Sequence, residues 1–181
     1  MKLSSFLLVA MLTSVHALAH AQADIVMKDK DVSEAALIEA LTPQRQFRTR
    51  SIRISPDNDG AGAAVKKAAA ASMLVTFETN SAELKPQSKK LLDTLGKAMQ
   101  SDKLLKFKFA IEGHADPRGG EQVNRELSQK RAETVVAYLA ETHHIDPSRL
   151  RAVGKGQSEP LNLSQPDAAE NRRVTVKTIV E

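Results

Sequence analysis

The strongest constraint on this fold is a strand, turn and helix pattern between residues 107 and 131. Apolar residues alternate with Lys and Ala from Leu105 to Ile111, which predicts a strand with one packed face and one wet face. A glycine-rich polar turn follows from Glu112 to Gly120, and an amphipathic helix then runs to about Thr142. Because turns at the carboxyl ends of strands often carry ligand groups, we expect a binding site here.

The remaining periodicity predicts an α+β fold, an α/β sandwich. Its β-α-β-α-β core has an extra short helix and a final strand. Further strands are expected at 73–77, 150–153 and 174–180, with helices beginning at Pro86 and Asp146-Pro147. The alternating strand implies that the helices cover a single face of the sheet. The long helix should direct four apolar residues inward: Val123, Leu127, Val135 and Leu139.

The first residues predict export. A single lysine, an apolar run from Leu3 to Leu12 and an Ala-His-Ala site suggest a signal peptide over 1–21, cleaved after Ala21. An uncleaved anchor is the alternative, but a membrane span needs about 20 apolar residues. We then expect a small N-terminal segment at 22–54, a linker at 55–71 and the main domain at 72–181. Ser33 should cap a helix in the small segment, and a short strand should follow at 48–54.

Composition excludes several classes of protein. There is no cysteine, so a thiol nucleophile, a disulfide framework and a Cys-based zinc site are absent. Without Lys2, the other 25 Lys and Arg residues face 22 Asp and Glu residues, a net charge of +3. The chain shows no basic run with interleaved aromatic residues, so we expect no nucleic-acid partner. We also expect no cofactor and no metal ion.

The candidate site combines one acid, one amide and one arginine. Asp116 follows the strand, whereas Asn124 and Arg131 lie two helical turns apart on one helix face, about 10 Å along the axis. The acid suits an ammonium and the arginine suits a carboxylate, so the pair suits a zwitterion. Gly113 and two later glycines would allow the backbone to approach a ligand closely.

Several motifs together resemble a known family. They are Glu112-Gly-His-Ala-Asp116, Gly119, Asn124, Leu127-Ser128, Arg131-Ala132, Gly154-x-Gly156 and Asn171-Arg172-Arg173. In this order they resemble the OmpA-like peptidoglycan-binding domain, the module shared by OmpA, the Pal lipoproteins and MotB. The resemblance covers about residues 72–181, and several motifs in register are more specific than one.

This resemblance implies a non-catalytic domain that binds the diaminopimelate of the peptidoglycan stem peptide. Asp116 and Arg131 match the two residues that hold diaminopimelate in the family, and Asn124 matches the family asparagine. Arg172 matches the late Asn-Arg-Arg element, which either touches the ligand or orients the last strand. Many relatives have Thr at the position of Ala115. The predicted ligand-binding residues are therefore Asp116, Arg131, Asn124, Arg172, Ala115 and Gly113.

Alternatives remain at this stage. A wall hydrolase would need a nucleophile with a base, paired carboxylates or a metal ion, and the chain shows neither G-x-S-x-G nor H-E-x-x-H. Residues 24–54 are a candidate docking segment for an outer-membrane or periplasmic partner, and a homodimer is open. His114 is expected to be a hydrogen-bonded structural histidine without the third ligand that a metal needs. The expected location is the periplasm, at the wall or peripheral to the outer membrane.

Overall fold

The computed structural model describes residues 26–27, 32–43, 69–78 and 81–180. Three predicted features lie wholly or mostly outside these residues: the signal peptide at 1–21, the strand at 48–54 and the linker at 55–71. Within the described residues, no helix is both long enough and apolar enough to cross a membrane.

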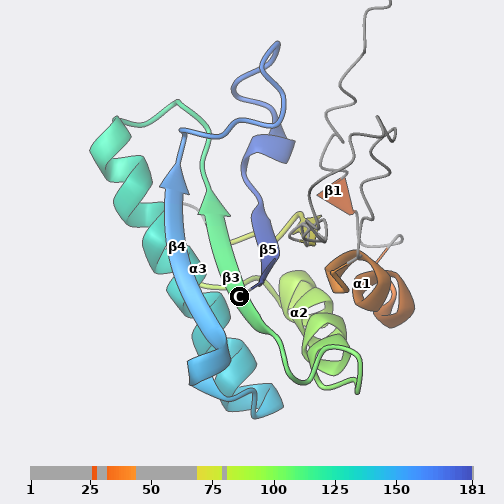
Figure 1. The fold of residues 1–181 in the computed structure, drawn as a ribbon. Helices are drawn as coiled ribbons and strands as arrows, with labels where there is room; N and C mark the ends of the chain where they lie inside the picture. The colour runs from red at the N-terminus through yellow and green to blue at the C-terminus, as the bar shows by residue number, and fades with distance from the viewer. Residues whose placement is uncertain (1–25, 28–31, 44–68, 79–80, 181) are drawn as a thin grey trace, which may run out of the picture.

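In the part of the chain that the structure describes, five strands form one mixed sheet (Figure 1). In spatial order they are β1 (Val26–Met27), β2 (Ala70–Met73), β5 (Val174–Ile179), β3 (Lys108–His114) and β4 (Leu150–Gly156). Strand β5 runs antiparallel to both β2 and β3, whereas β3 pairs with β4 in parallel and β1 with β2 in parallel. The parallel β3–β4 pair needs a crossover connection, which the longest helix provides.

The helices begin where their sequences favour helix starts. Helix α1 (Glu34–Leu41) is capped by the Ser33 hydroxyl, and α2 (Pro86–Met99) begins with proline at its first position. Helix α3 (Glu121–His143) connects β3 to β4 and lies behind both strands in Figure 1. Two short 3-10 turns, η1 (Pro147–Arg149) and η2 (Ala169–Asn171), precede β4 and β5. The predicted α+β fold is confirmed.

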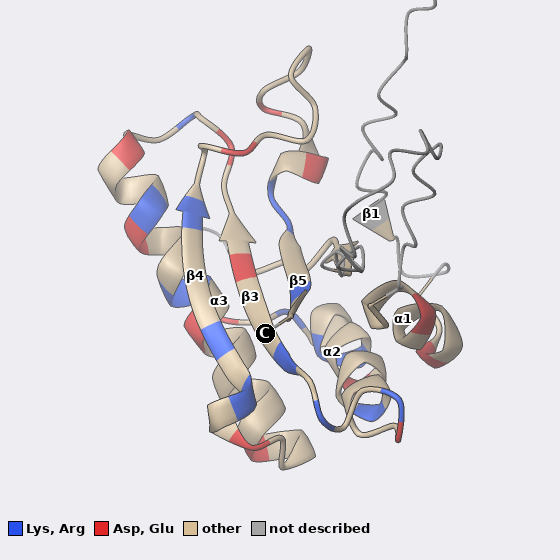
Figure 2. Ribbon diagram, viewed as in Figure 1, with Lys and Arg blue, Asp and Glu red and all other residues tan. Residues whose placement is uncertain are grey.

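The core lies between the sheet and the helices. Phe109 and Ile111 of β3 are fully buried against them, as is Val176 of β5. Glu112, the residue after Ile111, lies on the opposite face of the sheet and pairs with Lys177 of β5. Figure 2 shows acidic and basic positions along β3, β4 and β5. The expected division into a packed face and a polar face is therefore present.

The inward stripe of α3 differs from the prediction. Val123 is 62% exposed, and Leu127 is only partly buried. The buried residues of the helix are instead Asn124, Ser128, Ala132, Val135 and Leu139. The small and polar members of this stripe lie over the strand ends, where glycine backbones bring the helix too close for leucine.

Strand boundaries also differ from the prediction. Strand β2 was expected at 73–77 but lies at Ala70–Met73, so it begins inside the predicted linker. Strand β3 extends through Gly113 and His114, because both residues pair with neighbouring strands. Strand β4 likewise continues to Gly156 rather than ending at Val153. The polar turn therefore begins at Ala115.

The described part of the N-terminal segment is integrated into the domain. Strand β1 extends the sheet beside β2, and α1 packs against α2, β2 and β5. Leu37 and Leu41 are fully buried in the common core. The hydroxyl of Thr178 in β5 donates a hydrogen bond to the Leu41 carbonyl at 2.6 Å. The helix is thus part of the same packed unit as residues 72–181.

Candidate functional site

The loop after β3 holds Asp116 at the carboxyl end of the strand. Asn124, near the start of α3, donates hydrogen bonds to the carbonyls of Asp116 at 2.8 Å and Gly119 at 3.2 Å. Its amide also donates to the Gln157 side chain at 2.7 Å. The backbone N–H of Ala115 donates to the Gly156 carbonyl. Asn124 thus fixes the loop to the start of α3, and its amide donates to other residues of the protein.

Two arginines surround the carboxylate of Asp116. Arg118 donates from Nε to both oxygens at 3.1 Å and from a terminal nitrogen to Oδ2 at 2.7 Å. Arg172 donates to the same Oδ2 at 2.7 Å. The hydrogen bonds from Arg118, aided by Arg172, lower the pKa of Asp116 from 3.8 to about 2 despite the opposing effect of burial. The carboxylate is therefore ionised at neutral pH.

Arg131 is held from the opposite side. Its Nε donates to the Ser81 carbonyl at 3.1 Å, and its guanidinium carbon lies 4.9 Å from the ring centre of Phe77. Burial lowers the pKa of Arg131, and the positive charge of Arg172 adds to this effect. The arginine nevertheless stays charged, because guanidinium groups do not lose their proton in proteins. The hydrogen bond and the aromatic contact fix its direction.

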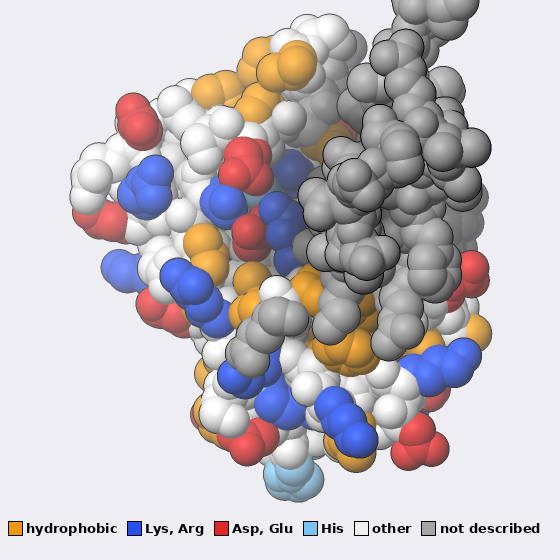
Figure 3. All heavy atoms as spheres, in the orientation of Figure 1, with side chains coloured by type: hydrophobic (Ala, Val, Ile, Leu, Met, Phe, Trp, Pro, Cys, Tyr) orange, Lys and Arg blue, Asp and Glu red, His pale blue; other side chains and the backbone are white. Residues whose placement is uncertain are grey.

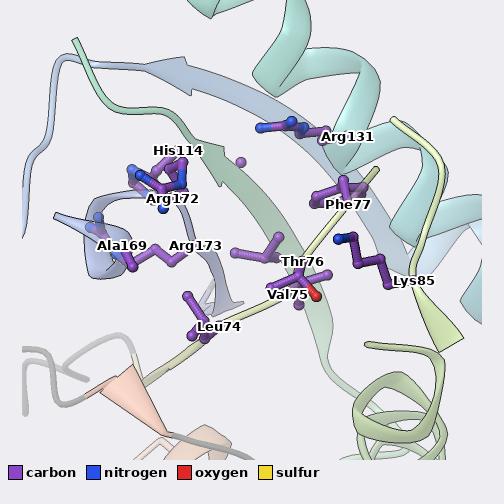
Figure 4. A pocket seen from close by; sticks show the side chains of 12 residues that line it. Leu74, Val75, Thr76, Phe77, Lys85, His114, Arg131, Ala169, Arg172 and Arg173 are labelled. Carbon is purple, nitrogen blue, oxygen red and sulfur yellow. The ribbon is translucent and has the colours of Figure 1, made fainter. Parts of the chain in front are cut away.

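A cavity of about 230 Å³ lies between these groups. Its lining comes from the segment after β2, the end of β3, α3 and the segment before β5. Figure 4 shows Arg131 on one side, with its guanidinium directed toward Arg172 and His114 on the other. Lys85 and Arg173 also line the cavity, so the charged residues described in its lining are all basic. Asp116 is not a lining residue but accepts a hydrogen bond from Arg172, which is one.

The segment before β5 is organised by Asn171. This side chain is 1% exposed and accepts hydrogen bonds from the backbone of Leu161 and Asn162. Its amide donates to three carbonyls of the same loop, those of Asn162, Gln165 and Pro166. The neighbouring Arg172 is thereby directed to Asp116, whereas Arg173 is buried and donates to the Glu159 carbonyl. Both arginines of the Asn-Arg-Arg element therefore line the cavity, and Arg172 also contacts Asp116.

An ion-pair network covers the open face of the sheet beneath the site. Lys177 Nζ lies 2.6 Å from Glu112 Oε2 in an ion pair whose angle falls outside hydrogen-bond geometry. Lys155 Nζ lies 2.7 Å from Glu159 and 3.5 Å from Glu112. Basic and acidic side chains are intermixed on the visible face of the molecule (Figure 3). This network gives the buried carboxylate of Glu112 two positively charged neighbours.

His114 contradicts the expected hydrogen-bonded histidine. It is 3% exposed, and neither ring nitrogen has a hydrogen-bond partner among the described residues. Burial, with the positive charge of Arg173 next in importance, lowers its pKa from 6.5 to about 3. The imidazole is therefore neutral at neutral pH and unsuited to bind an anion by charge.

A group of possible metal ligands exists, although sequence spacing did not indicate it. One ligand atom from each of Glu112, His114 and Glu159 lies within 4.8 Å of the others. Asp116, the acid two residues after His114, is not one of these ligands. However, Lys155 and Lys177 lie against both carboxylates, and both would have to leave before a metal ion could bind. The arrangement is that of a closed ion-pair network.

The six predicted ligand-binding residues fall into three groups. Arg131, Arg172 and Gly113 line the cavity, and Asp116 contacts the lining residue Arg172. Asn124 and Ala115 are buried and hold the loop. Sequence reasoning missed the aromatic support of Phe77 and the contact of Arg118. The Asp-Pro-Arg sequence was a usable signal, since an Asp side chain often accepts from the N–H two residues later.

Comparison with known proteins identifies the family. The model of the OmpA family matches residues 76–173, just over half of the 181 residues, and the chain belongs to this family. It is 38% identical over 104 residues to the probable lipoprotein YiaD of Escherichia coli K12, covering 56% of this chain and 46% of that protein. It is 32% identical over 103 residues to the peptidoglycan-associated lipoprotein of Pseudomonas aeruginosa, covering 56% and 59%.

The structural comparison agrees with the sequence comparison. The fold is similar to that of the peptidoglycan-associated lipoprotein from Burkholderia pseudomallei, with a TM-score of 0.51 and 28% identity. This match covers 60% of the present chain and 89% of the other. The chain spans about half the length of the relatives that it matches in sequence. The residues that the family model matches include β3, β4, α2 and α3 and end just before β5.

Proposed function

We propose that this protein is a non-catalytic peptidoglycan binder that tethers an exported chain to the cell wall in the periplasm. Its ligand is the diaminopimelate of the stem peptide. Asp116 receives the ammonium, while Arg131 and Arg172 receive the carboxylate. Asn124 and Ala115 act by positioning the loop rather than by touching the ligand. Membership of the OmpA family and the names of its peptidoglycan-associated relatives support this proposal.

The observation that carries the proposal is the charge arrangement at the cavity. Arg131 and Arg172, from different segments, line the cavity, and the ionised Asp116 accepts a hydrogen bond from Arg172. A zwitterionic ligand matches this arrangement, because each of its charges finds an opposite partner. Because Ser81 and Phe77 already hold the side chain of Arg131, this side chain loses little conformational freedom when a ligand binds.

The energetics suit a tether. Hydrogen bonds to charged groups contribute roughly 1.5 to 3 kcal/mol each, so a few of them give modest affinity for one stem peptide. The wall displays many copies of the peptide, and any oligomer of the protein would gain avidity.

Calorimetric titration with free diaminopimelate tests the proposed ligand. We expect Asp116→Asn and Arg131→Gln to lower its affinity at least about tenfold, because each removes a charge-assisted contact. Lysine is the matched ligand, since it lacks the second carboxylate, and we expect it to bind more weakly. Equal binding of both ligands, or no change in either variant, would contradict the proposal.

The non-catalytic part needs a separate test. Purified protein incubated with sacculi should release no soluble muropeptides above the level of a protein-free control. Turnover that persists in independently purified samples would show that the protein is a wall hydrolase instead.

A further inference from the structure

Arg118 raises a problem for the proposed ligand, because its guanidinium already lies on Asp116. Five contacts reach this carboxylate: four from Arg118, its backbone N–H included, and one from Arg172. A carboxylate has about four lone-pair positions for hydrogen bonds. An arriving ammonium therefore cannot simply add to the contacts present, and one donor must leave.

The structure distinguishes which arginine is easier to displace. The side chain of Arg118 is 64% exposed, and within the described residues its guanidinium donates its hydrogen bonds to Asp116 alone. The side chain of Arg172 is 39% exposed and also donates to the Asp167 carbonyl at 3.1 Å. It follows directly after Asn171, which is held by its loop hydrogen bonds. Arg118 can move into solvent, whereas moving Arg172 would disturb the loop.

The carboxylate keeps its position after that exchange. The backbone N–H of Arg118 donates to Asp116 Oδ1 at 3.2 Å, independently of where the side chain points. Arg172 continues to hold Oδ2. The departure of one guanidinium thus opens acceptor positions on an acid that stays oriented.

We propose that Arg118 is an internal counter-ion that competes with the ligand's ammonium for Asp116 and thereby sets the affinity of the site. This inference rests on the function proposed above. Because displacing the Arg118 guanidinium costs part of what the ammonium gains at Asp116, this contact contributes less affinity in the wild-type protein than an uncontested carboxylate would. Arg131 and Arg172 contribute further affinity through the ligand's carboxylate. Removing the guanidinium of Arg118 leaves acceptor positions open, so the ligand should bind more tightly.

The test compares calorimetric affinities for free diaminopimelate in a set of variants. We expect Arg118→Gln to bind roughly threefold more tightly than wild type. This gain corresponds to the small free energy of one exposed ion pair, which the ligand no longer has to break. Arg125→Gln is the matched control, because it removes one exposed positive charge from the same region. It should bind no more tightly than wild type. Thermal unfolding checks that each variant is folded.

A double variant isolates the mechanism. In an Asp116→Asn background, Arg118→Gln should bring no gain, because the contested carboxylate is gone. Equal or weaker binding by Arg118→Gln, or the same gain in Arg125→Gln, would overturn the counter-ion role. If wild type binds but Asp116→Asn has no effect, the assignment of Asp116 in the proposed function fails, and this inference fails with it. Tighter binding by Arg118→Gln that disappears in the double variant supports both the proposed function and the counter-ion role.

Discussion

At the scale of single residues, buried polar groups determine how this protein responds to pH. Asp116 is ionised and surrounded by donors, whereas His114 is neutral, buried and without a hydrogen-bond partner among the described residues. The two groups have the same sign of effect on stability. Each has a lowered pKa in the folded state, so the unfolded chain binds more protons and acid favours unfolding.

The pH range in which His114 affects stability follows from its pKa. The unfolded chain takes up a proton below about pH 6.5, but the folded protein resists until about pH 3. The free energy of unfolding should fall by about 1.4 kcal/mol per pH unit across that interval through this residue. We predict that His114→Phe removes most of this slope and is at least as stable at pH 7, since two unsatisfied nitrogens disappear.

Urea unfolding of both proteins between pH 7 and pH 4.5 measures this effect. Asp116 contributes to the pH dependence of stability between pH 3.8 and about pH 2, which is below the measured range. An unchanged pH slope in His114→Phe would show that His114 is not the group that titrates.

Sequence reasoning at this scale succeeded where local pattern fixed position. It placed Asp116 beside the strand end and Arg131 two helical turns from Asn124. Arg131 lines the cavity, and Asp116 contacts the lining residue Arg172. It did not foresee that Arg118 would turn back onto Asp116, because side-chain direction in a loop depends on neighbours distant in sequence. The meeting of His114 with Glu159 depends in the same way on the pairing of β3 with β4.

At the scale of elements, the close packing of α3 on the sheet positions the site. A Cβ atom on Gly113 would lie 2.3 Å from the Ser128 carbonyl oxygen, and one on Gly154 would lie 2.7 Å from the Arg125 carbonyl oxygen. The Ser128 hydroxyl also accepts from the Gly156 N–H at 2.8 Å. This contact explains why the prediction of Val123 as an inward residue was wrong. Helical periodicity identifies a face, but the strand glycines decide which side chains fit there.

We therefore predict that Gly113→Ala is destabilised by about 1 to 3 kcal/mol, because helix backbone must shift to admit the methyl group. Gly120→Ala is the matched control, since its added Cβ would meet nothing within 4 Å and its φ is −66°. That change should be neutral or slightly stabilising. Chemical denaturation measures both, and equal stabilities of the two variants would argue against close packing as the constraint.

At the scale of the whole molecule, the N-terminal segment is less separate than its composition suggests. The helix after Ser33 was expected, but sequence alone did not show that Leu37 and Leu41 enter the main core. Such contacts join residues more than a hundred positions apart, as between Leu41 and Thr178. Local periodicity carries no information on that pairing. The inner face of α1 is consequently occupied by this protein itself.

We predict that Leu41→Ala lowers the stability of the whole domain by about 2 to 5 kcal/mol, as expected for a fully buried leucine. Glu39→Ala, an exposed change on the same helix, should have little effect. Thermal unfolding followed by circular dichroism provides the measurement. An unfolding midpoint that stays at the wild-type value in Leu41→Ala would show that residues 22–54 form an independent docking segment.

The central claim concerns the wall itself, and co-sedimentation with purified sacculi tests it most directly. Wild-type protein, Asp116→Ala, Arg131→Ala and the control Arg125→Ala are mixed with sacculi containing diaminopimelate, and in parallel with lysine-type sacculi. We predict that wild type and the control sediment with the diaminopimelate-type wall, and that both site variants remain in the supernatant. Undiminished sedimentation of both site variants would contradict the proposed binding site.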